Sequence, residues 1–148
     1  MQVQLTSKSS FFSKRTFIEL VCYAHVFLFL YAGIYKLLDY RFFVEQLKLS
    51  PVIGIWAGMF AWAVPSVEIM IAVILLFPRT KSLGLYSAFG LMSIFTIYIF
   101  FLLNFSPMVP CSCGGILSGM GWHEHLYFNS GFVLFGAVAL YLNRRNKR

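Results

Sequence analysis

Four long apolar stretches constrain this chain more than any other feature of its sequence. They cover about residues 17–38, 52–77, 83–103 and 124–142, and Pro65 interrupts the second of them. A helix needs roughly 20 apolar residues to cross the hydrocarbon core of a bilayer. In the whole chain 59% of the residues are hydrophobic and 11% are charged, whereas about 25% are charged in a typical soluble domain. The sequence therefore predicts an all-α fold class, an integral membrane four-helix bundle.

The positions of the basic residues predict how the four spans are oriented. Lys and Arg collect in the arm 1–16, the turn 78–82 and the tail 143–148, while the connections 39–51 and 104–122 carry no net charge. Cytoplasmic loops of membrane proteins are enriched in Lys and Arg. Both termini are therefore expected in the cytoplasm, an N-in/C-in topology, and the two connections without net charge on the extracytoplasmic side of the membrane. This topology explains the net charge of +7, so the expected partner is the lipid bilayer and no nucleic acid is expected.

The chain divides into a cytoplasmic arm (1–16), one membrane domain (17–142) and a basic cytoplasmic tail (143–148). Between the first two spans, Phe43 and Leu47 recur at helical spacing among charged residues. This pattern is typical of an amphipathic helix at a membrane surface. A short interfacial helix on the outer side is therefore predicted, with an ordinary polar loop as the alternative.

Three ionisable side chains fall inside the predicted spans, Glu19, His25 and Glu68, and Lys36 falls near the end of the first span. Such residues are costly in a membrane and usually functional. Counted at about 1.5 Å per residue from the cytoplasmic ends, His25 and Glu68 lie at matching depth and are predicted to pair. The pair either holds two helices together or belongs to a proton path or a quinone headgroup site. Lys36 is expected to extend toward the lipid headgroups.

The segment PCSCGGILSGMGWHEHLYFN, residues 110–129, contains Cys111 and Cys113. On the extracytoplasmic side, two neighbouring cysteines tend to form a disulfide. A Cys-x-Cys disulfide closes a very small ring, so the bond is expected to be strained and easily reduced. A redox-active pair is therefore predicted, with an inert loop as one alternative. Cys22 lies almost a full bilayer away and is interpreted as a small core residue.

A metal site is the other alternative for this segment. Cys111, Cys113, His123 and His125 together supply four ligands of the kind that zinc and copper bind. Two ligands placed two residues apart on a helix point to different faces, so only one of the histidines is expected to approach the cysteines. No metal is therefore assigned, and these four residues are the ligand set to consider if one binds.

Three runs of the sequence resemble the MauE/DoxX family over residues 17–142: FLYAGIYKLLDYRFF, WAVPSVEIMIAVILL and the cysteine-containing segment. More narrowly, they are similar to the redox-associated, MauE-like branch of that family. The most specific part is C-x-C-G-G followed by W-x-x-H-x-x-F-N, which includes Trp122 and His125 and leaves His123 out. The resemblance implies a four-span bundle in the inner membrane.

The same resemblance implies a function. MauE is associated with methylamine utilisation, where it supports maturation of the disulfide-rich small subunit of methylamine dehydrogenase beside a thioredoxin-like partner. DoxX relatives are linked to quinone-coupled oxidation of sulfur compounds. The resemblance therefore implies thiol–disulfide chemistry, while methylamine is the name of the family rather than a substrate shown for this chain.

The site that follows from the motif and the resemblance has two parts. The expected catalytic residues are Cys111, Cys113 and His125, which exchange disulfides with an extracytoplasmic thioredoxin-like protein. A membrane quinone is the cofactor considered, and the residues expected to bind it are Glu68, His25 and Trp122. Two other interpretations stay open, a non-enzymatic accessory subunit with a structural cysteine loop and a metal-binding membrane protein.

Overall fold

The computed structural model describes residues 5–106 and 121–146, and within them side chains from Lys14 to Arg145. Every regular element in these residues is helical, which confirms the predicted all-α class. The elements in chain order are α1 (Leu5–Leu38), α2 (Tyr40–Lys48), the 3-10 turn η1 (Gly54–Trp56), α3 (Ala57–Leu76), α4 (Lys81–Phe105) and α5 (Trp122–Asn146).

Four of these helices are long and apolar enough to cross a membrane, which confirms the predicted number of spans. The spans are Lys14–Leu38, Gly54–Leu76, Lys81–Phe105 and Trp122–Arg145. The fourth begins slightly earlier than predicted because its first turn is capped. The Gly121 N–H donates to the Glu124 carboxylate at 3.0 Å, and such a contact satisfies a donor that the helix itself leaves unpaired.

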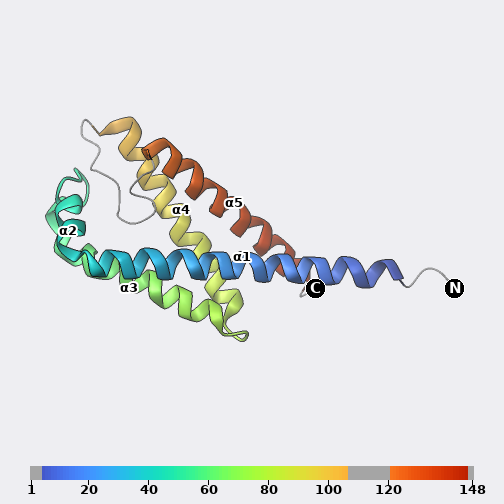
Figure 1. Cartoon of the computed structure of the whole chain (residues 1–148). Coiled ribbons are helices and arrows are strands. Elements are labelled where there is room, and N and C mark those ends of the chain that lie inside the picture. Colours follow the sequence, from blue (N-terminus) through green and yellow to red (C-terminus); the bar gives the residue numbers. More distant parts are fainter. Residues whose placement is uncertain (1–4, 107–120, 147–148) are drawn as a thin grey trace.

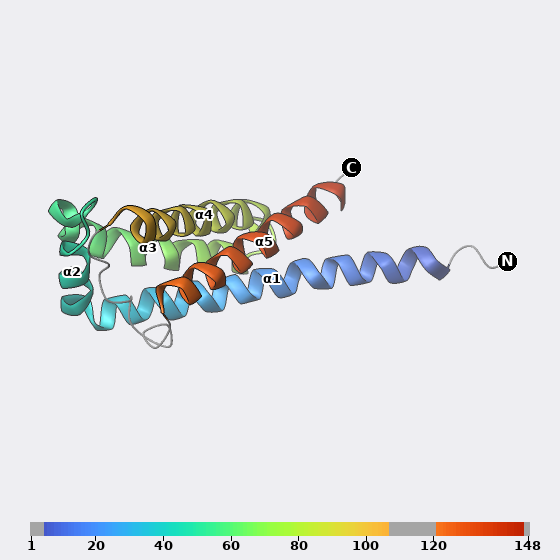
Figure 2. The same cartoon turned by 90° about the horizontal axis from the view of Figure 1, so that it is seen from above.

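The long helices form an antiparallel bundle (Figures 1 and 2) in which α1 packs on α3, α3 on α4, α4 on α5 and α5 back on α1. The start of α1, the α3–α4 turn and the end of α5 lie toward one end of the bundle. The opposite end carries α2, the end of α4 and the start of α5. The helix ends that adjoin the basic segments and those that adjoin the connections without net charge thus lie at opposite ends of the bundle, as the sequence predicts. The N-in/C-in orientation itself stays a prediction.

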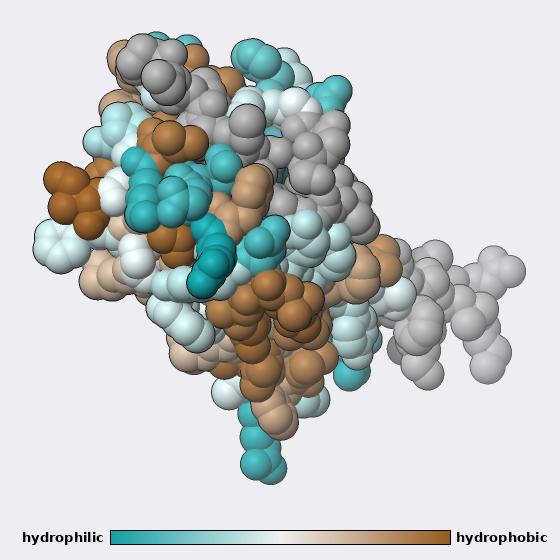
Figure 3. Space-filling view, turned by 60° about the vertical axis from the view of Figure 1, so that its left-hand side comes forward, coloured by the Kyte–Doolittle hydropathy of each residue, from teal (hydrophilic) through white to brown (hydrophobic). Residues whose placement is uncertain are grey.

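The outward faces of the four spans are apolar. Leu20 of α1, Met59 of α3, Ile97 of α4 and Leu134 of α5 are all exposed large hydrophobic residues. Figure 3, in which the end that carries α2 comes forward, shows hydrophilic side chains at that end and a broad hydrophobic surface beside them. A surface of this kind is solvated by lipid chains rather than by water.

Inside the bundle, one apolar core joins all four long helices. Phe29 of α1, Leu75 of α3, Leu85 of α4 and Leu140 of α5 are buried members of it. Cys22 is a free, buried cysteine in the same core, as predicted. This core holds the half of the bundle near the chain termini and leaves the half near α2 to a second, smaller cluster.

The second cluster forms where α2 covers the bundle. Phe43 and Leu47 on the apolar face of α2 are buried against Ala57 and Ala61 of α3, while Glu45 and Lys48 form an exposed ion pair of 2.8 Å on its polar face. The predicted amphipathic helix therefore exists, and its apolar face packs on the protein. α2 closes one side of the site described next.

Candidate functional site

A cavity of about 330 Å³ lies inside the α2 end of the bundle and touches all five helices. Known ligand pockets range over roughly 300–1,000 Å³, so this cavity can hold a small ring system. Its walls are mainly apolar. The polar or ionisable side chains among the described residues that line it are Tyr31, Lys36, Glu68, Tyr98, His125 and Asn129.

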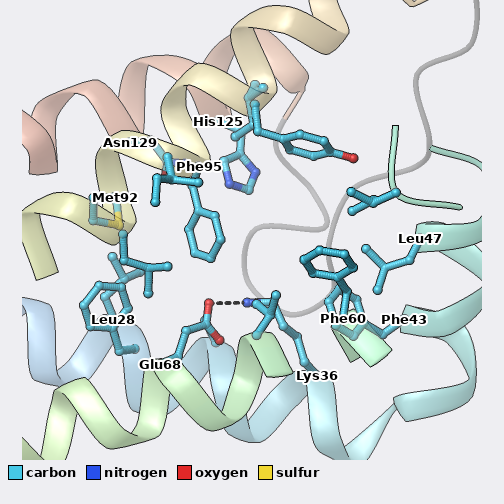
Figure 4. A pocket seen from close by; sticks show the side chains of 18 of the residues that line it. Leu28, Lys36, Phe43, Leu47, Phe60, Glu68, Met92, Phe95, His125 and Asn129 are labelled. Carbon is cyan, nitrogen blue, oxygen red and sulfur yellow. Dashed lines mark hydrogen bonds and ion pairs between the residues drawn. The ribbon is translucent and has the colours of Figure 1, made fainter. Parts of the chain in front are cut away.

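An ion pair forms the polar part of one wall. Lys36 of α1 donates to Glu68 of α3 with 2.6 Å between Nζ and Oε1, and their side chains are 12% and 1% exposed. The ammonium also lies 5.9 Å from the ring centroids of Phe43 on α2 and Phe95 on α4. Figure 4 shows the pair at the base of the cavity. Charges in such surroundings persist only when they are paired.

The close approach of α1 and α3 explains why these two side chains meet. A Cβ on Gly33 would lie 3.0 Å from Ile69 Cγ1 and 3.2 Å from the Pro65 carbonyl oxygen, so only a glycine fits there without a shift. Lys36 and Glu68 each come one helical turn after this contact in their own helices. Because the helices run antiparallel, Lys36 reaches across the contact to Glu68.

The predicted pairing of His25 with Glu68 is wrong. His25 Nδ1 donates to the Val21 carbonyl of its own helix at 2.8 Å. Its ring packs edge-to-face on Phe29 and Phe132, with centroid distances of 6.0 and 5.1 Å. His25 is thus fully buried against aromatic side chains of the bundle, and it does not line the cavity.

The error comes from the relative register of α1 and α3. The depth of His25 was counted from residue 17 as the start of the span, but α1 begins at Leu5. Glu19 lies beside Lys81, the first residue of α4, with 3.7 Å between Glu19 Oε1 and Lys81 Nζ. Glu19 is therefore at the end of the bundle rather than within it. Lys36, predicted to extend toward the headgroups, instead turns inward to Glu68.

The opposite wall of the cavity carries polar residues of α5. His125 is 8% exposed and Asn129, one turn later, is 4% exposed. Trp122 stacks on His125 with a centroid distance of 6.2 Å and an interplanar angle of 17°. In Figure 4 His125 enters the cavity from the side of α5, across from Lys36. His123 is exposed and does not line the cavity, so the two histidines of the motif have different surroundings.

Two buried polar atoms of this site, His125 Nδ1 and Glu68 Oε2, have no hydrogen-bond partner among the residues that the structure describes. Glu68 Oε2 faces Gly33, where a Cβ would lie 3.5 Å away. The His125 ring, in contrast, is directed into the cavity. A buried polar atom left unpaired costs about 1–3 kcal/mol, and a bound molecule can remove that cost at His125.

Cys111 and Cys113 lie outside the described residues. The segment that carries them joins the end of α4 to Trp122, which lines the cavity. Within residues 5–106 and 121–146 no three His, Cys, Asp or Glu side chains gather as a metal site would require. The metal alternative includes both cysteines and therefore stays a prediction.

The sequence reasoning gave no site role to Lys36 or Asn129, although it noted Lys36 near the end of the first span and the motif W-x-x-H-x-x-F-N ends at Asn129. Gly33 precedes Lys36 by three residues just as Pro65 precedes Glu68. In antiparallel helices these two positions lie on opposite sides of the contact, so the spacing alone does not predict a pair, and the length of the Lys36 side chain is what lets it reach Glu68. Asn129 comes one turn after His125, on the same face of the helix.

Comparison with protein families matches residues 14–142 to methylamine utilisation protein MauE. The chain belongs to the MauE family. This match confirms the MauE resemblance and does not extend to its DoxX part. Comparisons with curated proteins and with solved structures gave no match. Together with the four apolar helices, the family makes this chain a multi-pass membrane protein linked to methylamine utilisation.

Proposed function

We propose that this MauE-family protein is a membrane thiol–disulfide electron carrier that supports the maturation of an exported partner on the extracytoplasmic side of the bacterial inner membrane. The observation that carries the proposal is the cavity of about 330 Å³ with His125 in its wall. The segment with Cys111 and Cys113 leads directly into the helix that bears His125, so only a short stretch of chain separates the cysteines from a residue of the cavity.

In the proposed reaction, Cys111 and Cys113 start as a disulfide. A thiolate of a thioredoxin-like partner attacks one sulfur, forms a mixed disulfide and displaces the other cysteine as a thiolate. The second thiol of the partner then resolves the mixed disulfide, so the partner is oxidised and the Cys111–Cys113 pair is reduced to two thiols. His125 gives a proton to the cysteine that is displaced as a thiolate. It takes a proton from the cysteine that attacks when the disulfide forms again.

Regeneration of the disulfide requires the removal of two electrons and two protons. A membrane quinone, when bound, supplies the acceptor for both. The residues present fit such a group, because apolar and aromatic walls surround the ammonium of Lys36 and the unpaired nitrogen of His125. Trp122 and Glu68 belong to the same walls, whereas His25 does not.

The test is the redox state of the cysteines in native membranes. Free thiols are blocked with a maleimide of defined mass before and after reduction, and a Cys113→Ser variant is used to capture a mixed disulfide with a thioredoxin-like protein. We expect Cys111 and Cys113 to cycle and a covalent adduct to accumulate. Cys22→Ser is the matched control, because Cys22 is buried in the core, and it should trap nothing.

A pair that never changes its redox state and captures no partner would contradict the proposal. That result would favour the accessory-subunit interpretation, in which the cysteines have a structural role. Stoichiometric zinc or copper in the purified protein, lost in the Cys113→Ser variant, would instead favour the metal-binding interpretation.

A further inference from the structure

The cavity has a charged wall, the ion pair of Lys36 and Glu68, that takes no part in the thiol–disulfide exchange itself. Lys36 and Glu68 are on α1 and α3, and His125 and Asn129 face them from α5 (Figure 4). We propose that Lys36 is the anchoring residue of a binding site for a neutral, lipid-soluble ring that carries hydrogen-bond-accepting oxygens. The inference deepens the proposed function: it names the residue that anchors the ligand and the chemical features that the ligand must have. It rests on the proposed function only for the reaction that the ligand undergoes.

The hydrogen-bonding capacity of Lys36 indicates an oxygen acceptor. An ammonium has three N–H donors and no acceptor. In the part of the chain that the structure describes, Lys36 donates one hydrogen bond, to Glu68. The two remaining donors can therefore serve a carbonyl or another acceptor oxygen in the cavity.

The charge balance of the wall indicates that the ligand is neutral. The ion pair of Lys36 and Glu68 has no net charge, and Glu68 is 1% exposed. An anionic headgroup would compete for Lys36 and leave the buried carboxylate without its counter-charge, while a cationic headgroup would be repelled by Lys36. Leaving a buried charge unpaired is strongly unfavourable, so a neutral headgroup is favoured over both.

The remaining walls indicate a lipid-soluble ring. The rings of Phe43 and Phe95 flank the ammonium at 5.9 Å each, and aliphatic side chains such as Leu28 and Met92 continue the lining. Aromatic side chains stack favourably on flat rings. Apolar side chains beside them favour a hydrocarbon substituent.

The opposite wall indicates a second polar group on the same ligand. His125 Nδ1 is buried and has no hydrogen-bond partner within residues 5–106 and 121–146. Asn129 lines the cavity one turn further along α5. A ring with oxygens at both ends can bond to Lys36 with one and to His125 with the other. A molecule with a single polar end would leave one wall unpaired.

Trp122 gives a direct binding signal, because it lines the cavity and stacks on His125. The chain has three tryptophans, so a Trp56→Phe, Trp62→Phe background leaves Trp122 as the reporter. The protein is titrated in lipid nanodiscs with a 1,4-benzoquinone that carries a decyl chain, a strong quencher of indole fluorescence. A matched background that keeps only Trp62, an exposed tryptophan, measures quenching by probe dissolved in the lipid.

We expect saturable quenching of Trp122 and only linear quenching of Trp62. Lys36→Met alone would leave Glu68 unpaired and could unfold the protein, so the decisive variant is Lys36→Met with Glu68→Leu, which removes both charges. This double variant should keep its helical circular dichroism. Its dissociation constant for the probe should rise at least about tenfold, which is a loss of roughly 1.4 kcal/mol of binding free energy. Lys81→Met, at the other end of the bundle, should bind as the unchanged protein does.

Saturable binding of unchanged affinity in the folded double variant would overturn the role of Lys36. Equal competition by decane, which has no oxygen, would overturn the ligand class. The cysteines separate this test from that of the proposed function: Cys111→Ser with Cys113→Ser should still bind the probe, even if the protein proves to exchange no disulfides.

Discussion

At the scale of single residues, the ammonium of Lys36 and the carboxylate of Glu68 each depend on the other. Both are buried in apolar surroundings with 2.6 Å between Nζ and Oε1. Neither charge would be stable there alone, because an unpaired buried ion loses its hydration without compensation. The pair is therefore a condition for the fold around the cavity as well as a candidate ligand anchor.

The first prediction follows from this dependence. Glu68→Leu leaves the ammonium unpaired and should destabilise the protein by about 3–5 kcal/mol, whereas adding Lys36→Met should restore most of that stability. Thermal unfolding in detergent, followed by circular dichroism, measures both changes. If Glu68→Leu unfolds at the temperature of the unchanged protein, the pair does not support the fold.

The second prediction separates the two histidines of α5. His125 is buried at the cavity and His123 is exposed. Loss of a group that transfers protons typically slows a reaction by about 10²–10⁴-fold. His125→Phe should therefore slow thiol–disulfide exchange with a thioredoxin-like partner at least about 10²-fold, measured by quenched-flow alkylation. His123→Phe is the control, and an equal loss in both variants would contradict the role given to His125.

At the scale of helices, the contact at Gly33 sets how α1 and α3 meet. A Cβ at this position would come within 3.2 Å of the Pro65 carbonyl oxygen, an atom of the backbone that has little freedom to move. Small residues permit such close helix contacts in membranes. The contact fixes the register that aligns Lys36 with Glu68.

The third prediction tests that contact. Gly33→Ala should destabilise the bundle by about 1–3 kcal/mol, because the added methyl group overpacks the interface. Gly90→Ala is the matched control, since a Cβ there meets nothing within 4 Å and alanine favours the helix. Thermal unfolding of both variants checks the difference, and a Gly33→Ala variant as stable as Gly90→Ala would show that α1 and α3 can separate at no cost.

The helices themselves were predictable, and the pairing between them was only partly so. Long apolar runs need lipid wherever they lie, so the number, type and approximate bounds of the spans follow from composition alone. The partner of Glu68 depends instead on where two helices touch. That register comes from the fit of Gly33 against Pro65 and Ile69, which counting residues from an assumed membrane boundary cannot reveal. His125 was identified by its motif, but its burial at a cavity depends on packing.

At the scale of the whole molecule, each long helix runs from one end of the bundle to the other, so successive helix ends alternate between the two ends (Figure 1). The turn 78–82 contains Arg79 and Lys81 and no acidic residue, whereas at the opposite end Lys48 of α2 is paired with Glu45. Basic residues are retained on the cytoplasmic side. The end that bears α2 and the cavity is therefore expected to face outward.

The fourth prediction tests this orientation. In a cysteine-free background, Lys48→Cys should react with a membrane-impermeant maleimide in intact spheroplasts. Arg79→Cys should react only after the membrane is permeabilised, because its turn lies at the other end of the bundle. The reverse pattern of labelling would place the cavity on the cytoplasmic side and remove the basis for disulfide chemistry there.

The ammonium of Lys36 contacts side chains from three helices besides its own, Phe43 of α2, Glu68 of α3 and Phe95 of α4. A change at position 36 therefore acts on ligand affinity and on folding at once. Over evolutionary time, the two properties cannot be adjusted separately through this residue. Substitutions there should become acceptable only together with a compensating change at position 68. Specificity for different ligands should be acquired through the α5 wall, where the described side chains form no ion pair that a substitution would break.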